Sequence, residues 1–260
     1  MTQPALSTAF NAEDFEDIYP EGIEQHYWNS ARNRIISRAV RGRLMPTRNG
    51  QPPRVLDVGC GRGIVTAYLR SRGIDCWGCD LGVAPPVDAA TAPFLMPGAN
   101  AADLPEEFRR SVNMVLLLDV LEHLEDPTQL IRSLYDAFPN VDTILFTVPA
   151  RLELFSNYDV RNRHFRRYDA SNIQGLDTPD CFTLGHWSYF FHALYVPARL
   201  MKMAGVDRQT ELQAPKSSLT RLAHSAVATG FVIEESLLPG AWPGSSIRGV
   251  LKRVHRVKPA

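Results

Sequence analysis

Asp57, Gly59, Gly61 and Gly63 are the residues of this chain that could most readily bind a nucleotide-like ligand. The apolar residues around Asp57 predict a strand that is covered on both faces. The glycines then allow a tight turn and a close approach between backbone and ligand, and residues 64–70 continue at helical spacing. A strand, a glycine-rich turn and the start of a helix together form a cradle for such ligands.

The spacing of these glycines distinguishes between two kinds of cofactor. A dinucleotide-binding fingerprint has the pattern G-x-G-x-x-G, and Ile64 stands where its third glycine would be. The carboxylate of Asp57 would also be unfavourable beside a pyrophosphate, but it would suit a cofactor with a cationic centre and an amino group. The pattern therefore disfavours a dinucleotide. A turn that only connects a strand to a helix remains an alternative at this point.

Acidic residues follow two further strands that the sequence predicts. Residues 74–81 predict a short strand that ends at Asp80, whose carboxylate could accept hydrogen bonds from both hydroxyls of a ribose. Residues 112–118 form a near-continuous apolar run that predicts a central parallel strand, and Asp119 follows directly. An aspartate in a turn at a strand end is also common for structural reasons alone.

A segment with arginines and aromatic residues follows the next predicted strand. Residues 141–149 predict that strand, and residues 150–168 lie at the end of the sheet where α/β proteins bind ligands. Arginine side chains grip carboxylates and phosphates, so Arg166 and Arg167 could bind an anionic group. The alternative is a solvated basic loop, as charge runs usually are.

The chain resembles a known enzyme family at three places. Asp57 to Gly63 is similar to the first motif of the Rossmann-like, class I methyltransferases that use S-adenosylmethionine. Asp119 to Pro127 resembles the D-x-L-E-H-L-x-D-P segment of one large group of small-molecule methyltransferases. Residues 150–168 resemble a signature that ends in H-x-R-R-Y in a subgroup of bacterial methyltransferases.

The resemblance implies an α/β fold: a Rossmann-like, mostly parallel seven-stranded sheet with helices on both faces and an antiparallel last strand. It implies an N-terminal helical extension or lid over residues 1–50 and a methyltransferase domain over residues 51–260. The substrate loop would lie at about 151–175.

Hydrophobic spacing predicts further elements. They are a helix over 21–44, strands over 181–190 and 245–254, and an apolar helix over 191–204 that is interrupted at Pro197. Residues 83–100, which are rich in Pro and Ala, predict a loop in place of a regular helix.

The resemblance also implies roles for individual residues. His123 and His164 are candidates for the base that takes a proton from an acceptor, with a structural role for His123 as the alternative. The residues implied to bind the cofactor are Asp57, Gly59, Cys60, Gly61, Gly63, Asp80, Leu81, Asp103, Leu104, Asp119 and Val120. The candidate contacts to the acceptor are Tyr27, Arg32, Asp159, Arg166, Arg167 and Tyr168.

Composition limits the classes of partner. The chain has 28 basic and 28 acidic residues, and this balance argues against a nucleic-acid substrate. Cys76 and Cys79 form a single C-x-x-C pair, but a strand would turn them to opposite faces, so no metal is expected. All four cysteines are expected to be reduced, buried thiols.

We expect no signal peptide and no spanning helix, which predicts a cytoplasmic protein. A homodimer through the apolar helix is compatible with the sequence.

The predicted function is transfer of a methyl group from S-adenosylmethionine to a small molecule, such as a sugar, a lipid precursor or another metabolite, including anionic ones. Two alternatives remain. One is a nicotinamide-dependent oxidoreductase, which Ile64 and Asp57 disfavour. The other is a protein that keeps the fold but has lost catalysis and serves as a binding or scaffold partner.

Overall fold

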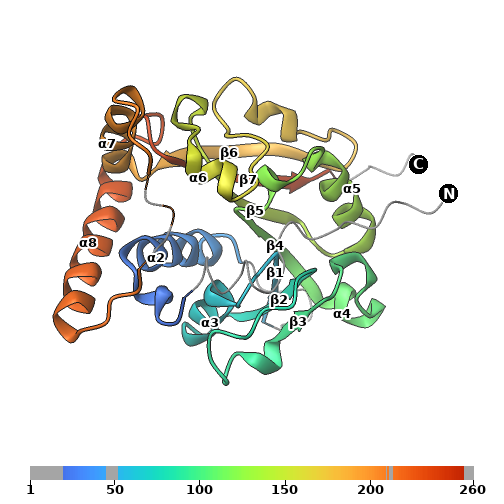
Figure 1. The fold of residues 1–260 in the computed structure, drawn as a ribbon. Coiled ribbons are helices and arrows are strands. Elements are labelled where there is room, and N and C mark those ends of the chain that lie inside the picture. The colour runs from blue at the N-terminus through green and yellow to red at the C-terminus, as the bar shows by residue number, and fades with distance from the viewer. Residues whose placement is uncertain (1–19, 45–51, 209, 211–212, 255–260) are drawn as a thin grey trace.

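Seven strands form one sheet through the centre of the computed structural model, which describes residues 20–44, 52–208, 210 and 213–254 (Figure 1). The strand order is β3-β2-β1-β4-β5-β7-β6, and β7 runs antiparallel to the other six strands of this described sheet. The predicted fold class is therefore confirmed. The strands are β1 (Arg54–Val58), β2 (Asp75–Asp80), β3 (Leu95–Pro97), β4 (Val112–Leu118), β5 (Thr143–Pro149), β6 (Phe182–Phe190) and β7 (Ser246–Arg253).

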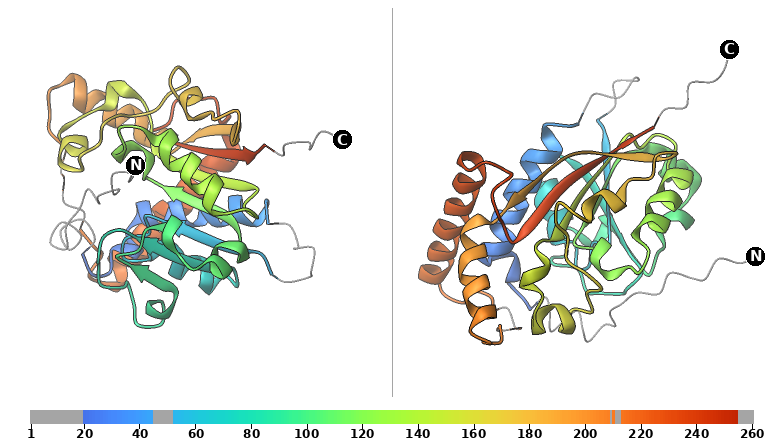
Figure 2. Two further views of the ribbon diagram at one scale, coloured as in Figure 1. Left: turned by 90° about the vertical axis from the view of Figure 1, so that its right-hand side faces the viewer. Right: turned by 90° about the horizontal axis from the view of Figure 1, so that it is seen from above.

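Helices cover both faces of this sheet (Figures 1 and 2). The α-helices are α2 (Tyr27–Arg41), α3 (Ile64–Ser71), α4 (Glu106–Ser111), α5 (Pro127–Ala137), α6 (Asn157–Arg161), α7 (His192–Met203) and α8 (Ser218–Leu237). Short 3-10 helices are η1 (Ile23–Gln25), η2 (Ala92–Phe94), η3 (Ala101–Asp103), η4 (Leu121–His123), η5 (Leu152–Leu154) and η6 (Ile173–Leu176).

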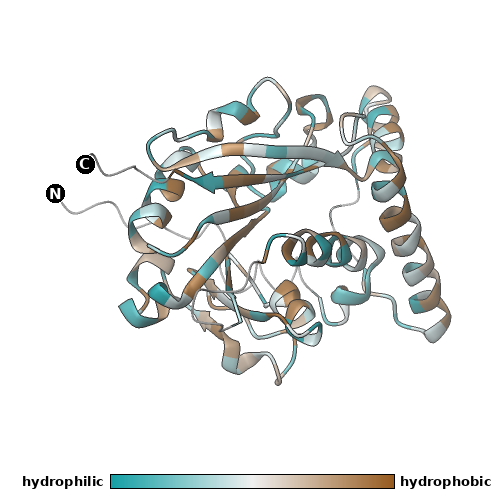
Figure 3. Ribbon diagram, turned by 180° about the vertical axis from the view of Figure 1, so that it is seen from behind, coloured by the Kyte–Doolittle hydropathy of each residue, from teal (hydrophilic) through white to brown (hydrophobic). Residues whose placement is uncertain are grey.

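The core follows from the alternation of side chains along the central strands, which are hydrophobic along most of their length (Figure 3). Val115 and Leu117 of β4 pack on the face that α5 covers. Leu116 packs on the other face, against residues of α2 and α3. Helix α8 lies outside α2, and a smaller cluster around Phe231 joins the two helices.

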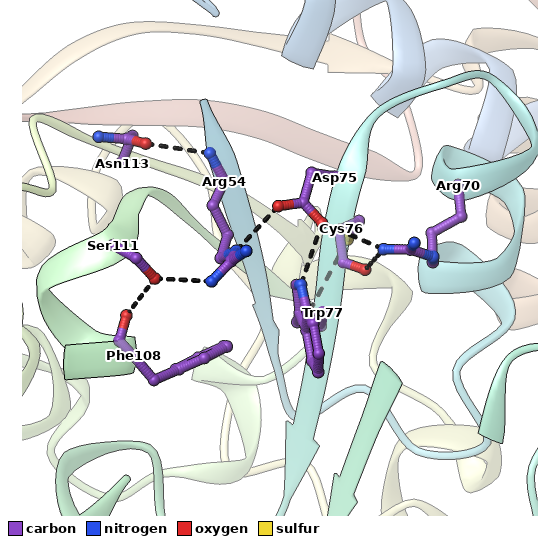
Figure 4. A network of polar contacts seen from close by, with 8 residues as sticks. All are labelled: Arg54, Arg70, Asp75, Cys76, Trp77, Phe108, Ser111 and Asn113. Atoms are coloured by element: carbon purple, nitrogen blue, oxygen red, sulfur yellow. Dashed lines mark hydrogen bonds and ion pairs between the residues drawn. The ribbon is translucent and has the colours of Figure 1, made fainter. Parts of the chain in front are cut away.

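A polar network ties β1, β2 and β4 together at the ends that lie away from the glycine turn (Figure 4). The Asp75 carboxylate accepts hydrogen bonds from Arg54 Nε at 2.8 Å, Arg70 Nη1 at 3.2 Å and Trp77 Nε1 at 3.0 Å. Arg54 Nη1 also donates to Ser111 Oγ at 2.9 Å. Burial opposes ionisation of Asp75, but its bonds with Arg54 prevail and hold its pKa below the usual range.

Several predicted elements need correction. Helix α7 runs through Pro197 without interruption. Pro197 removes a hydrogen bond to the carbonyl of Ala193, but both residues are exposed, so water can satisfy that carbonyl. The region 83–100 contains β3 as well as loop.

The cysteines differ in burial. All four are free thiols, but Cys60 is half-buried, whereas the other three are buried. Cys76 and Cys79 pack on opposite faces of the sheet, as predicted. The predicted N-terminal extension over residues 1–50 is described only for residues 20–44.

Candidate active site

The glycine turn joins β1 to α3 and requires glycine at two positions for steric reasons. Gly59 and Gly63 have φ angles of 79° and 78°, in the left-handed region. A Cβ at Gly59 would lie 2.6 Å from Val120 Cγ2, and one at Gly63 would lie 2.7 Å from Leu95 Cδ2. The turn therefore packs directly against the residues that follow β4 and those of β3.

Asp57 lies one residue before the end of β1, and its side chain is almost fully buried. Its Oδ2 accepts a long hydrogen bond of 3.4 Å from Thr66 Oγ1. Its Oδ1 has no hydrogen-bond partner among the described residues. Burial raises the pKa of Asp57 to about 7, although Arg32 opposes the shift. A buried carboxylate oxygen without a donor is a position where a ligand donor would be stabilised.

Asp80 and the turn hold each other in place. The carboxylate of Asp80 accepts the backbone N–H of Gly61 at 2.8 Å and that of Gly82 at 2.7 Å. Each carboxylate oxygen thus accepts one backbone hydrogen bond and keeps a lone pair that could accept a hydrogen bond from a ligand hydroxyl. Among the other residues predicted to bind the cofactor, Cys60 and Leu81 are half-buried, Leu104 is buried and Asp103 is exposed.

Asp119 follows β4 with a φ of 57° and connects the sheet to helix α2. Its Oδ2 lies 2.6 Å from Arg32 Nη2, and its Oδ1 accepts a hydrogen bond of 3.0 Å from Thr147 Oγ1. The guanidinium of Arg32 also lies over the ring of Trp28, at 5.1 Å. Of the predicted acceptor residues on α2, Arg32 therefore reaches the end of β4. Tyr27 instead contacts α8, where its N–H donates to His224 Nδ1 at 3.0 Å.

His123 and His164 come from segments far apart in the sequence and meet beside Glu122. Their ring centroids are 4.7 Å apart. The backbone N–H of Phe165 donates to the carbonyl of Glu122 at 2.8 Å and so joins the two segments. Burial, and next His164, lowers the pKa of His123 to about 4, so the imidazole is neutral at neutral pH. Candidate ligand atoms of Glu122, His123 and His164 lie within 4.8 Å of one another.

Glu122 is the notable residue at this site that the sequence did not indicate. Its side chain is fully buried, and neither carboxylate oxygen has a hydrogen-bond partner among the described residues. Burial, and next the charge of Asp119, raises its pKa well above the usual range. The adjacent His123 and the D-x-L-E-H pattern were the available signals, but neither shows that this carboxyl group points inward.

Asp159 organises the loop that carries His164. It is fully buried and accepts hydrogen bonds from His164 Nδ1 at 2.9 Å, Arg167 Nε at 2.8 Å and the Ser156 backbone N–H at 2.9 Å. Burial opposes ionisation, but the bonds from His164 and Arg167 outweigh it and hold the pKa of Asp159 at about 2. The carboxylate is therefore ionised and fixes the orientation of the imidazole.

The remaining predicted acceptor residues also contact the protein itself. Arg167 Nη1 donates to the Ala150 carbonyl at 3.0 Å, and the Tyr168 hydroxyl donates to the Leu121 carbonyl at 3.3 Å. Arg166 Nη2 donates to the carbonyls of Leu124 at 3.1 Å and Glu125 at 2.6 Å. The bonds of Arg166 and Tyr168 fasten the loop to the segment after β4, and that of Arg167 lies within the loop. Contact of these residues with an acceptor stays a prediction.

The fold and this arrangement define a class of protein, the Rossmann-like methyltransferases that depend on S-adenosylmethionine. The chain belongs to the methyltransferase domain family, whose model matches residues 27–179. None of the described helices is long and apolar enough to cross a membrane.

Curated relatives match a short part of the chain. The ubiquinone biosynthesis O-methyltransferase of Pseudomonas savastanoi pv. phaseolicola is 37% identical over 89 residues, which are 32% of this chain and 38% of the relative. The protein of that name from Stutzerimonas stutzeri is 35% identical over 91 residues, 31% of this chain and 37% of the relative. The match thus spans less than two fifths of these relatives.

Solved structures share the fold at low identity. Phospholethanolamine N-methyltransferase 2 of Haemonchus contortus has a TM-score of 0.51 at 17% identity, covering 93% of this chain and 60% of that one. The [4+2]-cyclase SpnF has a TM-score of 0.50 at 16% identity, covering 86% of this chain and 82% of that one. Because the fold is shared by a cyclase, the activity has to be argued from the site.

The turn fits the cofactor of this class, S-adenosylmethionine. The unpartnered Oδ1 of Asp57 offers an acceptor for its amino group, and the positions of Gly59 and Gly63 exclude side chains from the turn. A negative charge there also suits a sulfonium cation. Asp80 lies at the adjacent strand end, where the sequence predicts the ribose contact.

Proposed function

We propose that this protein transfers a methyl group from S-adenosylmethionine to a hydroxyl oxygen of a small molecule. The observation that carries the proposal is the buried Asp57 carboxylate with a free oxygen at a turn where side chains are sterically excluded. The choice of oxygen as acceptor atom is supported by the name of the curated relatives, which are O-methyltransferases.

The residues of the chain have two tasks in this reaction. When bound, the cofactor supplies an electrophilic methyl group: the acceptor oxygen bonds to the methyl carbon, and the carbon–sulfur bond breaks with its electron pair left on sulfur. The acceptor hydroxyl must also lose its proton. His164 is oriented for this step because its Nδ1 is bound to the Asp159 carboxylate, which leaves Nε2 as the ring nitrogen that can face an acceptor. His123 lies beside it.

Two segments are proposed to enclose the acceptor. Helix α2, which lies within the proposed lid over residues 1–50, is held to the end of β4 by the Arg32–Asp119 ion pair. The proposed substrate loop at about 151–175 is held by Asp159, Arg166 and Arg167. Closure by these segments would exclude water from the methyl group. Sugars, lipid precursors and anionic metabolites remain the proposed classes of acceptor.

The experiment is a turnover assay that measures S-adenosylhomocysteine released with panels of phenolic, sugar and carboxylate-bearing hydroxyl compounds. We expect release above the acceptor-free rate with at least one class. His164→Gln should lower kcat on that acceptor at least tenfold, whereas the exposed His186→Gln should leave it unchanged. Binding of the cofactor without turnover on any panel would instead support a scaffold protein that has lost catalysis.

A further inference from the structure

Glu122, His123 and His164 form a cluster of side chains that the cofactor site does not use. They combine one carboxylate with two imidazoles, and candidate ligand atoms of all three lie within 4.8 Å of one another. Protein ligands lie about 2.0–2.2 Å from a zinc ion, so small rotamer changes would bring these atoms around one ion.

Glu122 indicates a cation site more directly than the other two residues. Its side chain is completely buried, yet neither of its oxygens has a hydrogen-bond partner in the described part of the chain. The nearby carboxylates differ, because Asp119 is paired with Arg32 and Asp159 with Arg167. A buried carboxylate that lacks such compensation is costly, and coordination of a metal ion is one of the ways in which proteins stabilise it.

Both imidazoles are held as metal-binding histidines usually are. His164 Nδ1 is hydrogen-bonded to the Asp159 carboxylate at 2.9 Å, which leaves Nε2 for an ion. Backbone groups of Asn162 and Arg163 hydrogen-bond to the ring of His123. Carboxylate and backbone partners of this kind orient the ligands of a metal and raise their basicity. His123 is half-buried, whereas the side chain of His164 is only 8% exposed and that of Glu122 is fully buried, so the cluster is largely shielded from solvent.

We propose that Glu122, His123 and His164 bind a divalent transition-metal ion, such as Zn²⁺ or Mn²⁺, at the acceptor end of the site. Two imidazoles and one carboxylate favour such ions over Ca²⁺, which binds oxygen ligands. Three protein ligands leave at least one position open for the acceptor hydroxyl. The inference rests on the proposed function for its role: the ion would lower the pKa of that hydroxyl, whose proton then leaves to solvent. When the ion is bound, this replaces the role of His164 as the base, and His164 serves as a ligand.

The test is a calorimetric titration of chelator-treated full-length protein with Zn²⁺, Mn²⁺ and Ca²⁺. We expect one site for Zn²⁺ or Mn²⁺, and at least tenfold weaker binding in Glu122→Gln and in His164→Gln. The exposed Glu125→Gln and His186→Gln are the matched controls and should bind like the wild type. Absence of metal binding to the wild type overturns the proposal. So does an affinity in Glu122→Gln and His164→Gln that equals that of the wild type.

A thermal denaturation experiment supplies a second readout. The ion should raise the Tm of the wild type and of Glu125→Gln but not that of Glu122→Gln, because a ligand stabilises only a folded state that binds it. Glu122→Gln keeps the shape of the side chain and removes an uncompensated acid, so it should fold; if it does not, His164→Gln decides the question.

Titration of the same samples with S-adenosylmethionine separates the two proposals. Cofactor binding without metal binding overturns the metal site alone. Metal binding that is lost in Glu122→Gln, without any cofactor binding, supports the metal site and contradicts the proposed function.

Discussion

Two buried carboxyl groups, Asp57 in β1 and Glu122 after β4, keep oxygen atoms without a hydrogen-bond donor in the described residues. Folding alone disfavours such groups, because each loses its hydration without gaining a partner. Their position at one edge of a parallel sheet is where α/β proteins bind ligands. We therefore interpret both as groups that are stabilised only when ligands are bound.

At Asp57, removal of the charge should weaken cofactor binding. A hydrogen bond to a charged group contributes about 1.5–3 kcal/mol, so Asp57→Asn should raise the Kd for S-adenosylmethionine by about ten- to hundredfold. Calorimetry at pH 7.5 measures this change. The exposed Asp180→Asn is the matched control and should bind like the wild type. Unchanged affinity in Asp57→Asn would show that this carboxylate does not contact the cofactor.

The same residue should make the stability of the ligand-free protein depend on pH. The pKa of Asp57 is raised from 3.8 to about 7, so the folded state retains a proton between these values that the unfolded state loses. The stabilising contribution of this group is complete below about pH 4 and is lost as the pH rises to about 7. In urea unfolding, the free energy of unfolding of Asp57→Asn relative to that of the wild type should thus increase from pH 5 to pH 8. A constant difference between the two would contradict the shifted pKa.

The turn itself provides a prediction that separates backbone strain from steric contact. Gly59 and Gly73 have similar φ angles of 79° and 76°, but a Cβ at Gly73 would meet no atom within 4 Å. Gly73→Ala should therefore lower the free energy of unfolding only through the strain of the left-handed backbone conformation, by about 1–2 kcal/mol. Gly59→Ala should cost more, because its Cβ would clash with Val120. Denaturant unfolding measures both, and Val120→Ala should partly restore Gly59→Ala. Equal costs for the two glycines would contradict this packing.

At the scale of elements, the network around Asp75 fixes the ends of β1 and β2 that lie away from the site. Asp75→Asn should lower the free energy of unfolding by about 1–2 kcal/mol, because it loses charge-assisted bonds to Arg54 and Arg70. Cofactor affinity should not change. The pKa of Asp75 is lowered in the folded state, so its contribution is present above about pH 4 and is lost on further acidification.

Glu106→Gln, in an exposed pair with Arg110, is the control for this network and should change stability little. Urea unfolding at pH 7 compares the two variants. A loss no larger in Asp75→Asn than in Glu106→Gln would show that the network does not hold the strand ends together.

The sequence predicted best a strand that is buried on both faces and a turn that glycine residues form. The apolar run of β4 and the glycine turn leave few alternatives, and both occur where predicted. Helix α8 escaped prediction because only Ala228, Phe231 and Val232 of its 20 residues are buried, so its hydrophobic pattern is weak. Strand β3 has three residues and ends in Pro97, which gives little pattern to detect.

The candidate site was predicted less completely than the fold. Motif spacing identified residues near the ends of β1, β2 and β4, but not which charged groups would pair. Asp159 and Arg167 bind each other inside their own loop, and Glu122 is buried by contacts between distant segments. Such pairings depend on tertiary structure, which the local sequence does not contain.

At the scale of the whole molecule, the proposed acceptor end of the site draws on three separate parts of the chain. Helix α2 contributes Arg32, the segment after β4 contributes Asp119 and Glu122, and the loop after β5 contributes His164. The homodimer that the sequence leaves open is still to be tested. Light scattering on the purified protein measures the mass, and a monomer at micromolar concentration would contradict it.

The most direct measurement for the central claim is a calorimetric titration of the protein with S-adenosylmethionine, S-adenosylhomocysteine and NAD. We expect micromolar binding of the first two, with one site each, and no binding of NAD, because Ile64 and Asp57 do not fit a pyrophosphate. Binding of NAD, or the absence of binding by both adenosyl compounds, would contradict the claim that the β1 turn is a methyl-donor site.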